Sequence, residues 1–484
     1  MGRWNKSLST LSMLALSASA PVAAAELTDV VDALDVENNN PYDFHIEPSF
    51  QQRVERGNIS REFGCDPSTE PACSFPQTTE VRELDYRRII NTFDLDFQIG
   101  LFRDLEFHVD LPIVLRDQRT VEFSDGVNQE NSSLFPDQDR LDADTAAAIA
   151  DDESIFDTFR YFDVPNDGPS RSGIGDMTFG FAWSPFNDRR NPQVGNLTFV
   201  FDYLGPTGRP ARASNRGVGR GVHELQFAIN SSRYFEEVHL EPYFGFRVAL
   251  PFAAGNGLFA EDPNSTTTAP GQRFNFSTGT EVIMYSNVEE GQYYTFDFGL
   301  DFGYQFEGRD YTPLFDAFAN SFCNGLTPEE AGLDAIPDGN PYRPTQGTDP
   351  GNAACAWVIS QPGNAEALPG QSVTLGTPYA HDGILDTEGF ATFGGHTGFN
   401  LQVNEYVKFR INVGLDYRTP YFITTADAGR DANNNGIVDL NPTPDEEIVE
   451  RNPNYNLVLD GSGRRLRIEQ AVGVNWSLGA AFQF

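Results

Sequence analysis

The sequence predicts an all-β protein, a transmembrane antiparallel up-and-down β-barrel of about twelve strands with long extracellular loops, and fourteen strands is the alternative count. Three observations predict this fold. Apolar and polar residues alternate over most of the chain, short connections alternate with long ones, and the last predicted strand ends on an aromatic residue, Phe484. The chain contains no apolar run of about 18 residues or more, which excludes a helical membrane protein.

The amino terminus predicts export. Arg3 and Lys6 precede a weakly apolar stretch over residues 8–20, and residues 23–25 are all alanine. A basic start, an apolar middle and small residues at the end form the pattern of a secretory signal peptide, with cleavage expected before Glu26. The predicted division of the chain is a signal peptide over residues 1–25, a periplasmic N-terminal segment over 26–42 and the barrel over 43–484.

The alternation is clearest at the carboxyl end. Every second residue from Phe484 back to Val472 is apolar or aromatic, and the residues between them are small or polar. A soluble β-sandwich also alternates, but it gives no reason for short and long connections to alternate as well. The predicted strands cover residues 43–57, 80–99, 104–121, 172–185, 194–205, 221–235, 238–251, 272–286, 292–308, 387–403, 407–422 and 464–484.

The connections predict the orientation in the membrane. Short turns on one side and long loops on the other are typical of outer-membrane barrels, and an even strand number places both termini with the short turns in the periplasm. We therefore expect location in the bacterial outer membrane of a Gram-negative-type envelope, in contact with its lipid. The strand that ends at Phe484 resembles the terminal signal that delivers such proteins to the barrel-assembly machinery, which makes that machinery an expected partner. The predicted long connections are 58–79, 124–170, 206–220, 252–271, 309–386 and 423–463.

Acidic residues dominate the charge of the chain. The 484 residues include 70 Asp and Glu against 33 Lys and Arg, for a formal net charge of −37. This balance argues against nucleic-acid binding, which needs a basic surface. Three of the long connections, 124–170, 309–386 and 423–463, hold 12, 10 and 8 acidic residues with two arginines each. Much of the acidity is therefore predicted to face the exterior.

Alternation also predicts which charged residues face the lumen. Two interpretations of these residues stay open. A narrow interior can close through side-chain ion pairs, or it can form a polar conduit that is acidic on one wall and basic on the last two long strands. The predicted lumen residues are Asp94, Asp96, Glu106, His108, Asp110, Arg116, Asp202, Glu224, His239, Glu241, Arg247, Glu281, Asp297, Asp301, Lys408, Arg410, Asp416, Arg418 and Arg467.

The four cysteines fit an exported chain. An oxidising compartment favours two local disulfides, one between Cys65 and Cys73 and one between Cys323 and Cys355, although three connectivities are formally open. A zinc site is the weaker alternative, because no CxxC spacing or nearby histidine cluster is present.

One acidic loop predicts a calcium site. Gly436 permits a sharp turn, and the pattern resembles the DxDxDGxxD repeats of extracellular calcium-binding segments. Pro442 stands at the twelfth position of the loop, which excludes an EF-hand, and an ordinary Asn/Asp/Gly turn is the alternative. No other cofactor is expected. The candidate Ca²⁺ ligands are Asp431, Asn433, Asn435 and Asp439.

The sequence predicts no enzyme. No HExxH, GxSxG, Walker or Rossmann pattern appears. An outer-membrane phospholipase would need an HxSNG-type nucleophile segment, and His396-Thr397-Gly398 does not match that pattern.

Four segments carry a resemblance to a known family. They read GLFRDLEFHVDLPIV at 100–114, GIGDMTFGFAWS at 173–184, FDYLGPTGRP at 201–210 and HELQFAINSSRYF at 223–235. Together they resemble the outer-membrane channel family named for the meta-cleavage pathway of phenol degradation. That resemblance implies a single barrel that admits aromatic or other poorly soluble compounds.

The sequence therefore predicts a channel or transporter for passive or facilitated uptake of small molecules, among them aromatic or hydrophobic compounds. The chain departs from the pattern of the family in the acidic segments 124–170 and 309–386. The alternative is a surface structural or adhesion protein in which the barrel anchors calcium-binding loops.

Overall fold

The structure of the protein is a computed structural model. It describes residues 28, 30–31, 44–65, 77–102, 104–128, 131–132, 134, 164–187, 194–211, 216–253, 259, 267, 269–287, 292–319, 383–404, 406–427, 429, 460 and 465–484.

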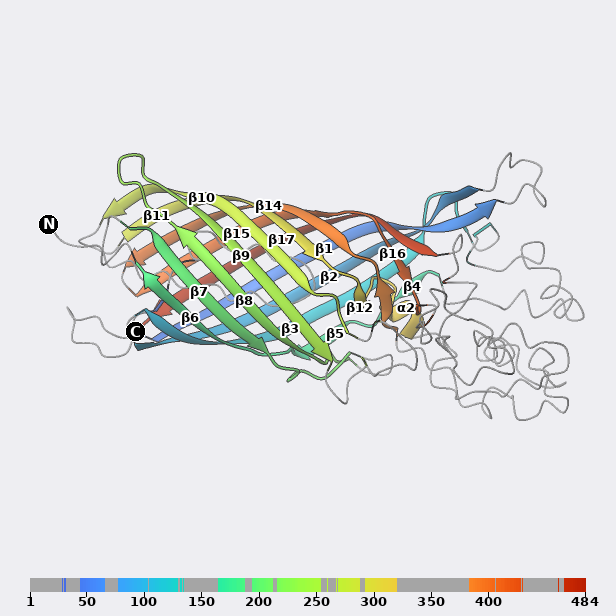
Figure 1. Ribbon diagram of the computed structural model, residues 1–484, viewed down its shortest axis with the longest axis horizontal. Helices are drawn as coiled ribbons and strands as arrows, with labels where there is room; N and C mark the ends of the chain where they lie inside the picture. Colours follow the sequence, from blue (N-terminus) through green and yellow to red (C-terminus); the bar gives the residue numbers. More distant parts are fainter. Residues whose placement is uncertain are drawn as a thin grey trace, which may run out of the picture.

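Twelve long strands form one closed antiparallel barrel, in which each strand pairs with its neighbour and β17 pairs back to β1 (Figure 1). The predicted all-β class and the predicted number of long strands are confirmed. The strands follow one another around the barrel as β1 (Phe44–Cys65), β2 (Gln77–Phe102), β3 (Leu105–Phe123), β6 (Thr178–Phe186), β7 (Asn196–Leu204), β8 (Val222–Ser232), β9 (Leu240–Ala253), β10 (Arg273–Asn287), β11 (Gln292–Gln305), β14 (Phe390–Asn404), β15 (Val407–Arg418) and β17 (Leu466–Gln483).

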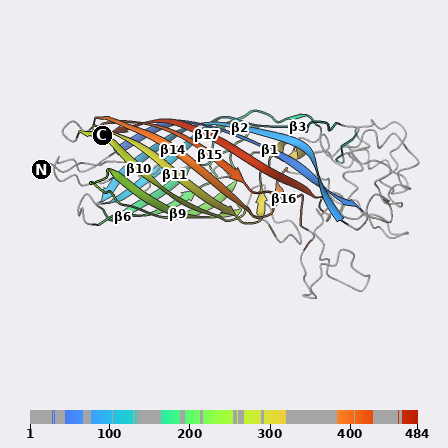
Figure 2. The same ribbon diagram turned by 90° about the horizontal axis from the view of Figure 1, so that it is seen from above.

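Strands β1 and β2 extend past the rest of the barrel at the end opposite the carboxyl terminus (Figures 1 and 2). They are 22 and 26 residues long, and their pairing continues to Cys65 opposite Gln77. The predicted long connection over 58–79 is therefore too long, because the hairpin uses half of those residues as strand.

Short elements gather at this same end (Figure 1). β4 and α2 fall in segments predicted as loops, and β12 and β13 do so except for one residue each. β16 was divided between the predicted strand 407–422 and the loop after it. β5 and β6 were predicted as the single strand 172–185, which the structure interrupts at residues 175–177. None of the helices in the described part of the chain is long and apolar enough to cross a membrane. The short elements are β4 (Asn166–Asp167), β5 (Arg171–Ile174), β12 (Gly308–Asp310), α2 (Phe315–Ala319), β13 (Leu385–Thr387) and β16 (Tyr421–Thr424).

The barrel is apolar outside and polar inside. On β11, Phe298 and Leu300 are 51% and 67% exposed, whereas Asp297, directly before Phe298, is 1% exposed. The outward positions of β3 are apolar from Leu105 to Leu115, over eleven residues. A tilted strand of about 9–11 residues crosses the hydrocarbon core of a bilayer. The outer surface therefore has the polarity and the height that a membrane requires.

Candidate functional site: the barrel interior

The inner wall of the barrel is lined with charged side chains. In β3, for example, burial alternates strictly from Leu105 to Val114, which turns Glu106, His108 and Asp110 inward. Most of the predicted lumen residues are buried on this inner face: Asp94, Asp96, Glu106, His108, Asp110, Asp202, Glu224, Glu241, Glu281, Asp297, Lys408, Arg410, Asp416 and Arg418.

Two further predicted lumen residues are slightly more accessible and still point inward. Arg247 Nη1 donates to Gln226 Oε1 at 3.0 Å, and Asp301 accepts a hydrogen bond from Ser277 Oγ at 2.7 Å. His239 does not belong to the interior, because it lies exposed in the turn before β9 with a positive φ of 53°.

The prediction for Arg116 is wrong. Leu115 and Arg116 follow each other on the outer side, where a register shift separates the pairs Asn91–Arg116 and Thr92–Val114. Arg116 Nε donates to Gln118 Oε1 at 3.2 Å, while the next residue, Asp117, is buried inside. A β-bulge of one residue thus reverses the alternation above the apolar part of β3.

The prediction for Arg467 is also wrong. Its neighbours Leu466 and Ile468 are buried in an apolar cluster, so Arg467 faces the other side and pairs with Glu80. A register shift between Gly57 and Ile59 on β1 is the physical reason. Beside it, Arg465 Nε donates a hydrogen bond to Glu62 Oε2 at 2.9 Å, which raises the pKa of Arg465 at the rim beyond the barrel wall.

A histidine joins two carboxylates in the part of the interior nearest the short turns. His108 Nε2 lies 2.8 Å from Asp202 Oδ1, and His108 Nδ1 lies 3.1 Å from Glu106 Oε1. The bridge from β3 to β7 passes over Gly180 of β6. A Cβ atom on Gly180 would lie 2.1 Å from His108 Nε2, so only glycine leaves room for this contact.

A second histidine cluster lies on the opposite strands. His396 Nδ1 lies 2.7 Å from Asp301 Oδ2, and His396 Nε2 lies 3.2 Å from both Asp297 Oδ2 and the Tyr243 hydroxyl oxygen. Gly299 between them again leaves the space, because a Cβ atom there would approach the His396 ring to 2.2 Å. Both aspartates were predicted as lumen residues, but Tyr243 and His396 were not. The alternation along β9 and β14 was the signal that could have placed them inside.

Arginines of β15 reach across β17 to carboxylates of β1. Arg410 Nη1 donates to Glu47 Oε2 at 2.7 Å, and Arg418 Nη2 donates to Glu55 Oε2 at 2.8 Å. In the reverse sense, Arg53 of β1 donates to Asp416 at 2.7 Å. The intervening strand carries small inward residues, so long side chains can pass over it. The β1 partners were missed by the sequence analysis, although they lie at every second position of the predicted first strand.

Two buried aspartates, Asp94 and Asp110, make no hydrogen bond to any residue that the structure describes. These residues are 5% and 1% exposed. An isolated charge in a dry apolar interior is strongly unfavourable. These groups therefore need hydration or neutralisation within the lumen, which a water-containing interior supplies.

Residues 308–319, which include β12 and α2, form a cap that closes the end of the barrel opposite the short turns. At its centre, Asp316 of α2 accepts hydrogen bonds from Arg171 and, at 3.3 Å, from Arg119 Nη1. The ring of Phe315 lies 5.2 Å from Arg171 Cζ and 5.6 Å from Arg119 Cζ. All four side chains are buried. The cap is thus held to the wall by a buried carboxylate between two arginines.

A second contact fixes the start of the cap. Arg220 Nη2 donates to Asp310 Oδ2 at 3.2 Å, and the Tyr311 hydroxyl donates to the carbonyl oxygen of Ala211 at 3.2 Å. β12 also pairs with β13, β13 pairs with β16, and β16 pairs with β17, so these short strands join the cap to the wall.

Apolar side chains fill the space between the cap and the wall. The cap contributes Leu314, Ala317 and Phe318 to this cluster. The rings of Phe390 and Tyr421 stack within it, with centroids 4.3 Å apart. The cluster further includes Ile59, Leu84, Tyr86, Val121, Leu134, Leu385, Ile423, Leu466, Ile468 and Ala471.

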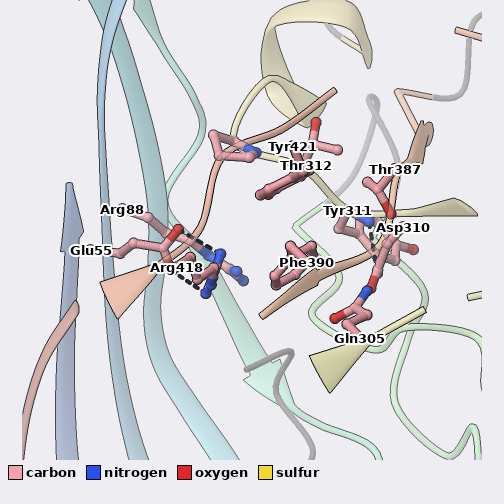
Figure 3. Close-up of a pocket in the computed structure, with 11 residues that line it drawn as sticks. Glu55, Arg88, Gln305, Asp310, Tyr311, Thr312, Thr387, Phe390, Arg418 and Tyr421 are labelled. Carbon is pink, nitrogen blue, oxygen red and sulfur yellow. Dashed lines mark hydrogen bonds and ion pairs between the residues drawn. The ribbon is translucent and has the colours of Figure 1, made fainter. Parts of the chain in front are cut away.

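A small cavity lies under the cap, between the ion pairs and the aromatic rings. Its volume is about 30 Å³, which holds water but not a solute. Figure 3 shows Arg418 bound to Glu55 on one side and Asp310 and Tyr311 on the other, with Phe390 between them. The interior is therefore narrow where the polar lumen meets the apolar cluster.

Residues near the amino terminus lie inside the barrel. The carbonyl oxygen of Thr28 accepts a hydrogen bond from Thr198 Oγ1 at 2.9 Å, and the amide of Val31 donates to Glu106 Oε2 at 2.8 Å. The prediction of a periplasmic segment is therefore wrong for these residues, which line the lumen instead. No periodicity in the sequence marked them. Val30 packs against Ala182, Val200 and Ala228.

The remaining predictions fall outside the described residues. The candidate calcium loop, 431–439, is outside them, and so are the side chains of all four cysteines and the signal peptide. Within the described ranges, no group of three or more His, Cys, Asp or Glu residues is arranged to hold a metal ion.

No protein family model and no curated protein matches this chain. An outer membrane channel from Pseudomonas putida F1 is similar at a TM-score of 0.36 and 8% identity, with 90% of this chain and 95% of that chain covered. A Pseudomonas aeruginosa FadL homologue gives a TM-score of 0.27 and 8% identity over 92% and 90% of the two chains. The outer membrane protease OmpT from Escherichia coli gives 0.24 and 7% over 91% and 97%. These values are too low to support an argument about function.

The molecule itself defines its class. A closed antiparallel barrel with an apolar outer surface and a charged interior is a transmembrane β-barrel of the bacterial outer membrane. The predicted fold class and location are thereby established, and the outer surface of the barrel contacts membrane lipid.

Proposed function

We propose that the protein is an outer-membrane channel for small molecules, and that it opens when the cap leaves the barrel. The observation that carries the proposal is the way the end of the barrel is closed. Asp316 and its neighbours in the cap belong to the segment between β11 and β14, not to the wall. A closure made by an inserted segment can be withdrawn while the hydrogen-bonded wall stays intact.

The lining under the cap supports aromatic or poorly soluble compounds as the substrate class. Withdrawal of Phe318 would expose Tyr86, Phe390 and Tyr421, which lie in the apolar cluster at the opening. Aromatic faces favour aromatic solutes through offset stacking. The sequence resemblance to the phenol meta-cleavage channel family supports the same class.

The buried ion pairs favour a second candidate, a barrel that only anchors its extracellular loops. The pairs Arg410–Glu47 and Arg418–Glu55 join β15 to β1 along the inner wall and fill part of the lumen. If these pairs keep the interior closed permanently, the barrel serves only as an anchor and the cap does not have to leave it.

Assembly is a separate part of the proposal. Phe484 completes the last strand, and its amide donates to the carbonyl oxygen of Phe44 at 3.0 Å. We propose that this terminal strand is recognised by the barrel-assembly machinery. Truncation of Phe484 should lower outer-membrane insertion.

Liposome swelling tests the channel. The variant Asp316→Asn removes the charge that holds Arg171 and Arg119, and breaking a buried pair in this way costs about 3–5 kcal/mol. We expect faster uptake of small aromatics by the variant than by the parent. The matched control is Asp85→Asn, because Asp85 pairs with the exposed Arg82 at the same end but outside the lumen.

The outcomes separate the two candidates. Swelling by Asp316→Asn but not by Asp85→Asn supports a channel closed by the cap. Equal, negligible swelling of the parent and both variants, with all three barrels folded by heat-modifiability on gels, contradicts the channel and favours the anchor.

A further inference from the structure

The outer surface carries two arginines that are direct cross-strand partners on β1 and β2. Arg56 of β1 comes directly after the outward positions from Phe44 to Val54, and Arg87 of β2 stands at the corresponding place beyond Ile89. Each of these two arginines is the first charged outward residue beyond an eleven-residue, mostly apolar stretch. On β3 the residue opposite Arg87 is Thr120, whereas Arg116 lies lower, opposite Asn91. We call Arg56 and Arg87 the arginine patch.

The patch brings like charges together. Arg56 and Arg87 are direct cross-strand partners, and both are exposed. Like charges directly opposite each other destabilise a sheet. Neither guanidinium makes an ion pair or hydrogen bond with any residue that the structure describes. The nearest outward carboxylate on β2, Asp85, is already bound to Arg82 at 2.7 Å. The sheet alone therefore gives no stabilising reason for this arrangement.

Neighbouring strands lack charge at the same level. Beyond Val472, the next outward residue of β17 is Gln470, and beyond Tyr417 on β15 it is Thr419. On β3, the residue opposite Arg87 is the uncharged Thr120, so the positive charge at this level lies on β1 and β2. In a chain with a net charge of −37, this local cationic surface needs its own explanation.

A polar row under the patch marks the membrane boundary. Trp476 Nε1 donates to the outward-facing Gln52 at 3.1 Å, and Gln52 Nε2 donates to Asn91 Oδ1 at 2.9 Å. Tryptophans concentrate at membrane–water interfaces. Arg56 and Arg87 lie one or two outward positions beyond this row, at the depth of lipid headgroups on the side of the long connections.

We propose that the arginine patch binds the phosphate groups of a phosphorylated glycolipid in the outer leaflet. Guanidinium groups form bidentate, charge-assisted hydrogen bonds with phosphate, and two adjacent arginines suit such a group. The apolar wall directly below the patch would contact the acyl chains of the same lipid. This continuity of charge and apolar surface favours a membrane lipid over free phosphate.

The experiment measures lipid binding by the intact barrel in detergent. Native mass spectrometry would titrate the full chain with a bisphosphorylated lipid A and with its dephosphorylated form. We expect the parent to prefer the phosphorylated lipid, and the Arg56→Gln/Arg87→Gln variant to lose about 30-fold in affinity for it. The Arg82→Gln control should bind like the parent, since that arginine is already paired with Asp85. Inorganic phosphate at millimolar concentration should not displace the lipid.

Three results would overturn the proposal. They are equal binding of both lipid forms by the parent, unchanged binding by the double variant, and full displacement by inorganic phosphate. Heat-modifiability on gels confirms that each variant is folded before binding is measured. The patch is outside the lumen, so this result is independent of the channel proposal.

Discussion

The substitution Gly180→Ala tests whether His108 and Asp202 are in contact in the barrel interior. Gly180 lies on β6 between His108 of β3 and Asp202 of β7, and all three are in register. In Gly180→Ala, the new Cβ would lie 2.1 Å from His108 Nε2 and 2.2 Å from Asp202 Oδ1. Both distances are far below van der Waals contact, so the histidine–aspartate bridge must break.

The cost follows from two contributions. Overpacking of a close-packed site costs about 1–3 kcal/mol. Loss of a hydrogen bond to a charged group costs about 1.5–3 kcal/mol. We therefore expect Gly180→Ala to lower the free energy of unfolding by about 3 kcal/mol or more.

Urea unfolding in detergent or lipid vesicles, followed by tryptophan fluorescence, measures this change. The matched control is Gly395→Ala on β14, where a new Cβ would meet only ordinary contacts at 3.5 and 3.6 Å. The control should stay within about 0.5 kcal/mol of the parent, in the range of an unstrained surface substitution. If Gly180→Ala unfolds at the same urea concentration as the control, the bridge over Gly180 does not exist as described.

Two other predictions concern the lumen wall and the loops. Arg410→Ala removes a bridge to Glu47 and should raise single-channel conductance in planar bilayers, whereas Arg467→Ala should not, because Arg467 faces away from the lumen. An equal effect of both substitutions would contradict the assignment of faces. Isothermal titration with calcium should give a heat of binding that Asp431→Ala abolishes, and identical titrations of the parent and the variant would remove the calcium site.

The sequence predicted the wall of the barrel well because lipid imposes a strict rule on it. Every second residue of a spanning strand must be apolar, and this signal persists over eleven residues. Inward residues such as Asp297 and Lys408 follow from the same parity. The prediction fails where a β-bulge adds one residue to a strand. Beyond the bulge, the residues expected to face the lumen face outward, as at Arg116.

The cap and the residues near the amino terminus were not predicted for a different reason. Their contacts join positions far apart in the chain, such as Asp316 with Arg171 and Val31 with Glu106. No local period marks such contacts. A weak signal existed at 310–319, where an aromatic, apolar run interrupts an acidic segment. The composition of that run is more typical of a buried insert than of a solvated loop.

The single-channel current of the parent and of Asp316→Asn in planar bilayers tests the central claim most directly. The proposed channel predicts a parent that is mostly closed and a variant with larger or longer openings, because the buried arginines no longer hold the cap. Two folded proteins that both give no current, or identical current, would contradict a channel gated by this cap.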